Sequence, residues 1–203
     1  MRALMKQTVS RLAADYTVLQ DGEEIFKIHV PFALHTVKVE VSNASGHLCT
    51  MERAIVGDAP LTQRNMFHIF SAPDCEAGYI ARRRRYHQLV KADTFDISFH
   101  GYDYTAYEIA LWKDGIYFPV YENEKQVAMV HKGTKVRDNL DVYELYALDS
   151  RSMYTTVLFA AYIDVLKFRH AGEFCKNKVE VKFSFSLSRK ARAMLNKSFM
   201  DKC

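Results

Sequence analysis

One uncharged run, residues 153–163, constrains the fold of this chain more than any other feature. A surface helix carries one apolar stripe opposite a polar face, whereas residues 157–163 leave no polar face at all. The run is too short to cross a bilayer, which takes about 20 predominantly apolar residues. Asp164 then ends it with a charge. We therefore predict a helix over residues 150–169 that the rest of the protein encloses.

The chain before this helix has the pattern of a series of short strands. Residues 36–41 alternate apolar and polar side chains with the two-residue period of a strand. Asp21-Gly22 and Asp114-Gly115 each separate two apolar runs, which is a strong signal for a tight hairpin turn. About 12 such strands precede the helix. The sequence thus predicts a mainly β fold, an antiparallel closed β-barrel of about 12 strands around a central buried hydrophobic α-helix.

A basic extension, residues 171–203, follows the predicted barrel domain of residues 1–170. The extension has a net charge of +5, whereas the barrel domain has a net charge of −1. Residues 178–187 alternate without a break, which predicts a C-terminal strand. Its apolar face needs cover, so we expect it to pair with the barrel's own rim or with another copy of the chain. Ser188 can cap a short final helix over residues 189–200.

Several classes of function find no support in the sequence. It contains no motif of a hydrolase, a zinc protease, a P-loop or a dinucleotide-binding fold, so we expect no enzyme and no cofactor. The histidines stand singly and the cysteines lie far apart, which gives no metal-ligand spacing. The 25 Tyr and Phe side chains alternate along strands, which favours a core over nucleic-acid stacking. Four scattered cysteines without a signal peptide favour free thiols and a cytoplasmic location.

Three stretches are similar to segments of one known superfamily. Residues 16–30, YTVLQDGEEIFKIHV, resemble its early hairpin, and residues 126–133, QVAMVHKG, resemble a strand near the end of its barrel. Residues 141–168 look like its closing strand and central helix, and Asp164 stands where that helix often carries an aspartate. These features resemble the tubby C-terminal-like superfamily, in its LURP-one-related and bacterial tubby-like branch, related to the phospholipid scramblases. The resemblance covers residues 1–170 and implies a 12-stranded barrel threaded by the helix. The basic extension departs from it.

Two groups of basic residues are candidate anion-binding sites. Four adjacent arginines can present bidentate hydrogen-bond donors to phosphate oxygens. Three more cations stand on the polar side of the predicted final helix. The candidate residues are Arg82, Arg83, Arg84, Arg85, Arg189, Lys190 and Arg192. The alternative is that both groups are solvated and confer solubility only.

The resemblance also implies a class of ligand, because tubby-type domains of animals bind phosphoinositide head groups through basic side chains. We expect a non-enzymatic barrel protein that binds anionic phospholipid or phosphoinositide at a membrane surface, in the cytoplasm and peripherally at the inner membrane surface. The alternative is an intracellular scaffold or regulatory protein that binds another protein through its C-terminal extension. We expect no catalytic residues, no metal and no nucleic-acid partner.

Overall fold

The computed structural model describes residues 1–32, 36–53, 65–83, 93–169, 177–186 and 189–203. The strands are β1 (Arg2–Ser10), β2 (Ala14–Gln20), β3 (Glu23–Val30), β4 (Lys38–Asn43), β5 (Gly46–Arg53), β6 (Met66–Ala72), β7 (Cys75–Arg83), β8 (Thr94–Phe99), β9 (Tyr102–Tyr107), β10 (Ile109–Trp112), β11 (Gly115–Glu122), β12 (Lys125–Lys132), β13 (Lys135–Arg137), β14 (Val142–Ala147), β15 (Val179–Val181) and β16 (Ser184–Phe185). The helices are α1 (Ser150–Ile163), the π-helix η2 (Asp164–Phe168), α2 (Arg189–Ala193) and the 3₁₀ helix η3 (Lys197–Lys202).

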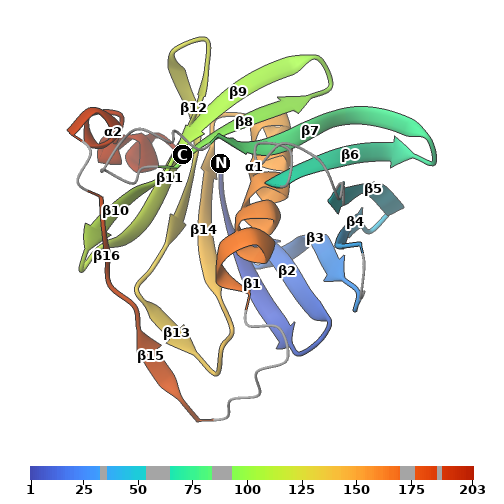
Figure 1. The fold of residues 1–203 in the computed structure, drawn as a ribbon, viewed down its shortest axis with the longest axis horizontal. Helices are drawn as coiled ribbons and strands as arrows, with labels where there is room; N and C mark the ends of the chain where they lie inside the picture. The colour runs from blue at the N-terminus through green and yellow to red at the C-terminus, as the bar shows by residue number, and fades with distance from the viewer. Residues whose placement is uncertain (33–35, 54–64, 84–92, 170–176, 187–188) are drawn as a thin grey trace.

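Twelve antiparallel strands close into a barrel, which confirms the predicted fold class. The ring runs from β12 through β14 and β1 to β9, then to β11, which pairs back onto β12. Closure leaves these strands without a free edge. β10 and β16 extend the sheet outside the ring, and β13 pairs with β15 in a separate two-stranded sheet (Figure 1).

Local sequence explains how the strands and their turns form. In β1 the buried positions alternate, with Ala3, Met5 and Gln7 turned inward. Asp21 and Gly22 form the tight turn between β2 and β3 with φ values of 52° and 87°, which suit Asp and Gly. The second predicted Asp-Gly hairpin joins β10 to β11. Two-residue periodicity and turn residues therefore specify most of the barrel.

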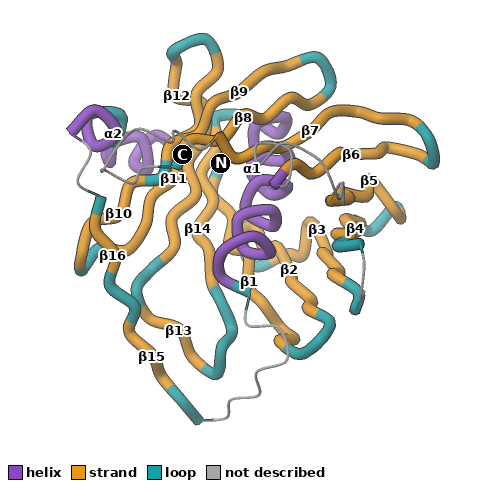
Figure 2. The backbone as a smooth tube through the Cα atoms, in the orientation of Figure 1, coloured by secondary structure: helices purple, strands orange, loops and turns teal. Residues whose placement is uncertain are grey.

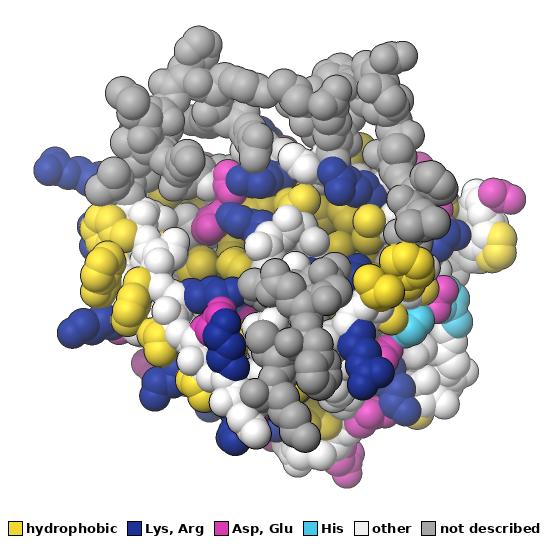
Figure 3. Space-filling model, turned by 60° about the horizontal axis from the view of Figure 1, so that its bottom comes forward, with side chains coloured by type: hydrophobic (Ala, Val, Ile, Leu, Met, Phe, Trp, Pro, Cys, Tyr) yellow, Lys and Arg dark blue, Asp and Glu magenta, His cyan; other side chains and the backbone are white. Residues whose placement is uncertain are grey.

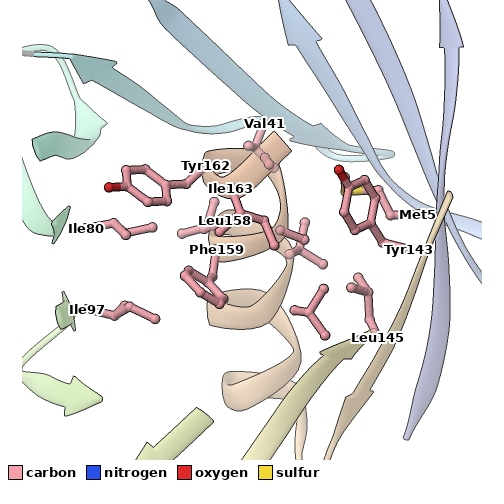
Figure 4. Close-up of a cluster of buried hydrophobic side chains, with 14 of the residues drawn as sticks. Met5, Val41, Ile80, Ile97, Tyr143, Leu145, Leu158, Phe159, Tyr162 and Ile163 are labelled. Atoms are coloured by element: carbon pink, nitrogen blue, oxygen red, sulfur yellow. The ribbon is translucent and has the colours of Figure 1, made fainter. Parts of the chain in front are cut away.

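The helix α1 lies inside the ring of strands, as Figures 1 and 2 show. Its N-terminus is capped by the Asp149 carboxylate, which accepts a 2.7 Å hydrogen bond from the backbone N–H of Ser152. Every residue from 157 to 163 is fully buried. Figure 4 shows Leu158, Phe159 and Tyr162 among strand side chains that point toward the helix. The predicted enclosed helix is confirmed, and its final turns are π-helical rather than α-helical.

The extension departs from its predicted elements in two ways. The predicted strand over 178–187 is two short strands, and both pair within the chain: β15 with β13, and β16 with β10. The predicted short C-terminal helix is present as α2, but it ends at Ala193 rather than at residue 200, and Asn196 is extended (φ −111°, ψ 97°) between α2 and η3. Phe199 still packs, with Tyr117 and Met129, in a small second hydrophobic cluster outside the main core.

Candidate functional site

The two described residues of the four-arginine run have carboxylate partners. Arg82 forms an ion pair with Asp93. Arg83 makes a bidentate contact with Asp96 on the neighbouring strand β8, at 2.9 and 2.5 Å. Arg84 and Arg85 lie outside the described residues. The charges of Arg82 and Arg83 are therefore balanced within the protein, which weakens this part of the predicted anion site.

Asp93 also belongs to a cluster of charges beside the end of the helix. Lys167 of η2 donates to Asp93 at 2.9 Å and to Glu108. Burial would raise the pKa of Asp93, but the charge and hydrogen bond of Lys167 and the bond from Arg82 hold it below its usual value. Burial raises the pKa of Glu108. Two cations facing two carboxylates make a locally balanced cluster that ties the helix end to the barrel wall.

The three basic residues of the extension lie in a different setting. Arg189, Lys190 and Arg192 are all exposed on α2. In the described part of the chain no carboxylate forms an ion pair with any of them. Arg192 lies over the ring of Phe185, with 5.0 Å between the guanidinium carbon and the ring centroid. These three cations remain available to an external anion.

Next to these cations lies a row of exposed apolar side chains, which we call the aromatic rim. Its members are between 47% and 60% exposed: Trp112, Val179, Val181, Phe183 and Phe185. Trp112 stacks on Phe183 with ring centroids 5.5 Å apart and 13° between the planes. The face that the sequence predicts to need cover is thus left open. Large apolar residues that gather at the surface are typical of binding sites.

More cations surround the aromatic rim. Lys113 follows Trp112 directly and is exposed. Lys135 and Arg137 of β13 stand opposite Val181 and Val179 in the strand register. Directly opposed residues share a face of a sheet, so these exposed cations lie beside the apolar side chains. In Figure 3 hydrophobic side chains line the left edge, the side on which β10 and β16 lie in Figure 1, with Lys and Arg side chains above and below.

A second polar group lies buried in the barrel around Asp164, whose surface is fully covered. Tyr16 and Tyr143 both donate hydrogen bonds to the Asp164 carboxylate, the latter at 2.6 Å. Burial, and then the charge of Asp141, raises the pKa of Asp164 to about 6. The surrounding side chains close this carboxyl off from solvent. It serves to fasten the end of α1 to β2 and β14.

A buried ion pair completes this polar group. Lys132 and Asp141 contact each other, and both are almost fully covered. The Lys132 ammonium also lies 5.0 Å from the ring centroids of Tyr143 and Phe168. No local pattern in the sequence marks this pair. Lys132 stands two residues after the apolar run 127–130, which could have indicated a buried lysine, but its partner Asp141 depends on the fold.

The described part of the chain contains no group of three or more His, Cys, Asp or Glu side chains that could hold a metal ion. Among its helices, none combines the length and apolar character needed to span a membrane. Comparisons of the chain with protein-family models, with curated proteins and with solved structures find no match.

Proposed function

We propose that this chain is a non-enzymatic, tubby-like barrel protein that binds an anionic phospholipid surface through the aromatic rim and the cations of its C-terminal extension. The observation that carries the proposal is the adjacency of exposed Trp112, Phe183 and Phe185 to the available cations of α2. Apolar side chains enter the headgroup boundary of a bilayer while neighbouring cations meet its anionic groups. A barrel closed around one apolar helix also supports the resemblance to the tubby-like superfamily.

The expected binding is weak and reversible. A cation near an anionic leaflet contributes about 1 kcal/mol, and full burial of one Val or Phe side chain contributes about 1.5–3 kcal/mol. The rim side chains already lose part of their exposure to the protein, so each contributes less than the full amount. Cations and apolar side chains together, rather than either alone, therefore hold the protein at the surface.

The four-arginine run plays a smaller part in this proposal. Arg82 and Arg83 already form ion pairs with Asp93 and Asp96. A lipid phosphate would have to displace these carboxylates, which has a cost in free energy. A phosphoinositide site that uses Arg84 and Arg85 stays a prediction from the sequence. The alternative function, a scaffold that binds protein through the extension, is supported by the backbone edge of residues 178–186, which has no described strand beside it.

Vesicle sedimentation tests the proposal with neutral vesicles and with vesicles that contain acidic phospholipid, at low and moderate salt. We expect binding to acidic vesicles only, weakened by salt because screening shortens the reach of the charges. Replacing Phe183 and Phe185 by serine should remove most binding. The matched control is Phe32→Ser, since Phe32 is 54% exposed and Phe183 is 53% exposed.

Two results would overturn the proposal. One is equal sedimentation with neutral and acidic vesicles. The other is acidic-vesicle binding that falls no further in the Phe183→Ser, Phe185→Ser double variant than in Phe32→Ser. Replacing Arg189, Lys190 and Arg192 by glutamine separates the electrostatic part, and it should reduce binding most at low salt.

A further inference from the structure

The extension crosses the outside of the barrel as a strap, residues 178–186. Its backbone hydrogen bonds to the described residues lie along one edge. Every second residue bonds toward β13 or β10. The bonds run from Asp138 N to Lys178 O at 2.8 Å, from Lys182 N to Thr134 O at 2.9 Å and from Ser186 N to Ala110 O at 2.9 Å. Glu180 lies opposite Val136, and Ser184 lies opposite Trp112. The even-numbered residues of the strap are therefore the ones whose backbone groups face β13 and β10.

The other edge of the strap has no described strand beside it. In an antiparallel pair, successive residues direct their N–H and C=O groups to opposite sides. The backbone groups of Val179, Val181, Phe183 and Phe185 therefore point away from β13 and β10. Among the described strands, β15 pairs only with β13 and β16 only with β10, so none covers this edge. An exposed edge with apolar side chains is a template for another strand.

We propose that a second copy of this chain pairs with that edge, strap against strap and antiparallel, with Val181 opposite the partner's Val181. The two-fold axis then passes between the two Val181 residues, and the same surface is used on both copies. Val179 lies opposite the partner's Phe183, an aliphatic–aromatic pair of a kind that stabilises sheets. This inference does not rest on lipid binding.

Charge selects this register over its neighbours. With Val181 at the centre, Glu180 lies opposite the partner's Lys182, and the symmetry repeats that favourable pair. A shift in one direction places Glu180 opposite the partner's Glu180. A shift in the other places Lys182 opposite the partner's Lys182. Like charges directly opposed destabilise a sheet, so both adjacent registers are disfavoured. The register centred on Val179 also places Glu180 opposite a lysine, the partner's Lys178, but it overlaps the two straps over residues 178–180 only, against residues 178–184 with Val181 at the centre.

The paired straps would place two aromatic rims on one face, because opposed residues in a sheet share a face. If the proposed lipid binding holds, one dimer meets a membrane with both rims at once. Two linked weak sites bind far more tightly than either alone.

A charge-swap series on the full-length chain tests the pairing by analytical ultracentrifugation. We expect the unchanged chain to be a dimer. Glu180→Lys and Lys182→Glu should each raise the dissociation constant of that dimer about tenfold or more, because each change places like charges opposite each other twice. The double variant E180K/K182E restores the opposite-charge pairs and should restore the dimer. A chain that stays monomeric at all concentrations, or a double variant as weak as the single ones, overturns the proposal.

Disulfide trapping tests the register itself. Opposed hydrogen-bonded residues of an antiparallel pair have Cα atoms about 5.5 Å apart, a separation that a disulfide spans. Val181→Cys should therefore give a covalent dimer under mild oxidation. Val179→Cys is the matched control, since Val179 faces Phe183 of the partner subunit rather than its own copy. The unchanged chain reports any cross-linking through its own cysteines. Equal trapping of both variants contradicts the proposed alignment.

Discussion

The Tyr143 hydroxyl donates a 2.6 Å hydrogen bond to the Asp164 carboxylate in the closed interior of the barrel. Tyr16, which is 148 positions from Asp164 in the chain, donates to the other carboxylate oxygen. Asp164 begins the π-helical turns that end the central helix. The two tyrosines therefore join the first and last parts of the barrel domain at the point where the chain leaves the interior.

This buried carboxyl predicts a specific pH dependence of stability. Burial raises the folded pKa of Asp164 to about 6 from 3.8, so the folded state holds this proton more tightly than the unfolded state. The resulting stability is present below the unfolded pKa and is lost as the pH rises through about 6. This rise in the pKa of Asp164 corresponds to a loss of about 3 kcal/mol in the free energy of unfolding above that pH.

Asp164→Asn removes that titration. Chemical unfolding at pH 4, 5, 6 and 7 should show the unchanged chain losing stability relative to the variant as the pH rises. The amide's own hydrogen bonds add an offset that does not vary with pH, so the trend is the readout. A stability difference that stays constant from pH 4 to 7 would contradict the assignment.

The helix cap at Asp149 predicts a pH dependence of stability opposite to that of Asp164. The backbone N–H of Ser152 is the main cause that lowers the pKa of Asp149. A lowered pKa stabilises the fold above the unfolded value and loses that contribution as the pH falls. Asp149→Ala should cost about 1 kcal/mol at neutral pH, measured by chemical unfolding, whereas Asp149→Ser keeps a capping oxygen and should cost less. Equal losses in the two variants would show that the cap contributes little.

The second hydrophobic cluster predicts that the extension can detach while the barrel stays folded. Phe199 is 3% exposed and packs with Tyr117, Met129 and Tyr146. Phe199→Ala should increase hydrogen exchange and proteolysis in α2 and η3 and leave the strands of the ring protected. Phe183→Ala, at an exposed position, is the control and should leave the exchange of α2 and η3 unchanged. Uniform loss of protection in both regions would mean that the extension belongs to the main folding unit.

Local patterns account for the part of the fold that the sequence predicts. The uncharged run within α1 is buried on all sides, and the Asp-Gly turns join paired strands, because periodicity and turn geometry are properties of neighbouring residues. The extension shows where such patterns fail. Its alternation fits one long strand, yet the strap changes partner from β13 to β10, and Asn196 interrupts the apolar periodicity of the final helix.

The candidate site could be predicted only in part, because it depends on pairings across the barrel. The sequence identifies the cations of α2 and the alternation of the strap. It does not reveal that Asp96 neutralises Arg83, since that contact depends on the register of β7 and β8. It also does not place Trp112 against Phe183, which lies 71 positions away in the chain. These contacts follow from strand order, which a local pattern does not encode.

The fluorescence of Trp112 reports whether the aromatic rim enters an anionic bilayer. Trp112 is the chain's only tryptophan, is 56% exposed and stacks on Phe183 within the aromatic rim. If the rim enters the headgroup boundary of an anionic bilayer, acidic phospholipid vesicles should shift its emission to shorter wavelength and protect it from a water-soluble quencher. Neutral vesicles should cause neither change. An emission spectrum and quenching that stay the same with acidic vesicles, under conditions in which the protein sediments with them, would contradict insertion of the rim.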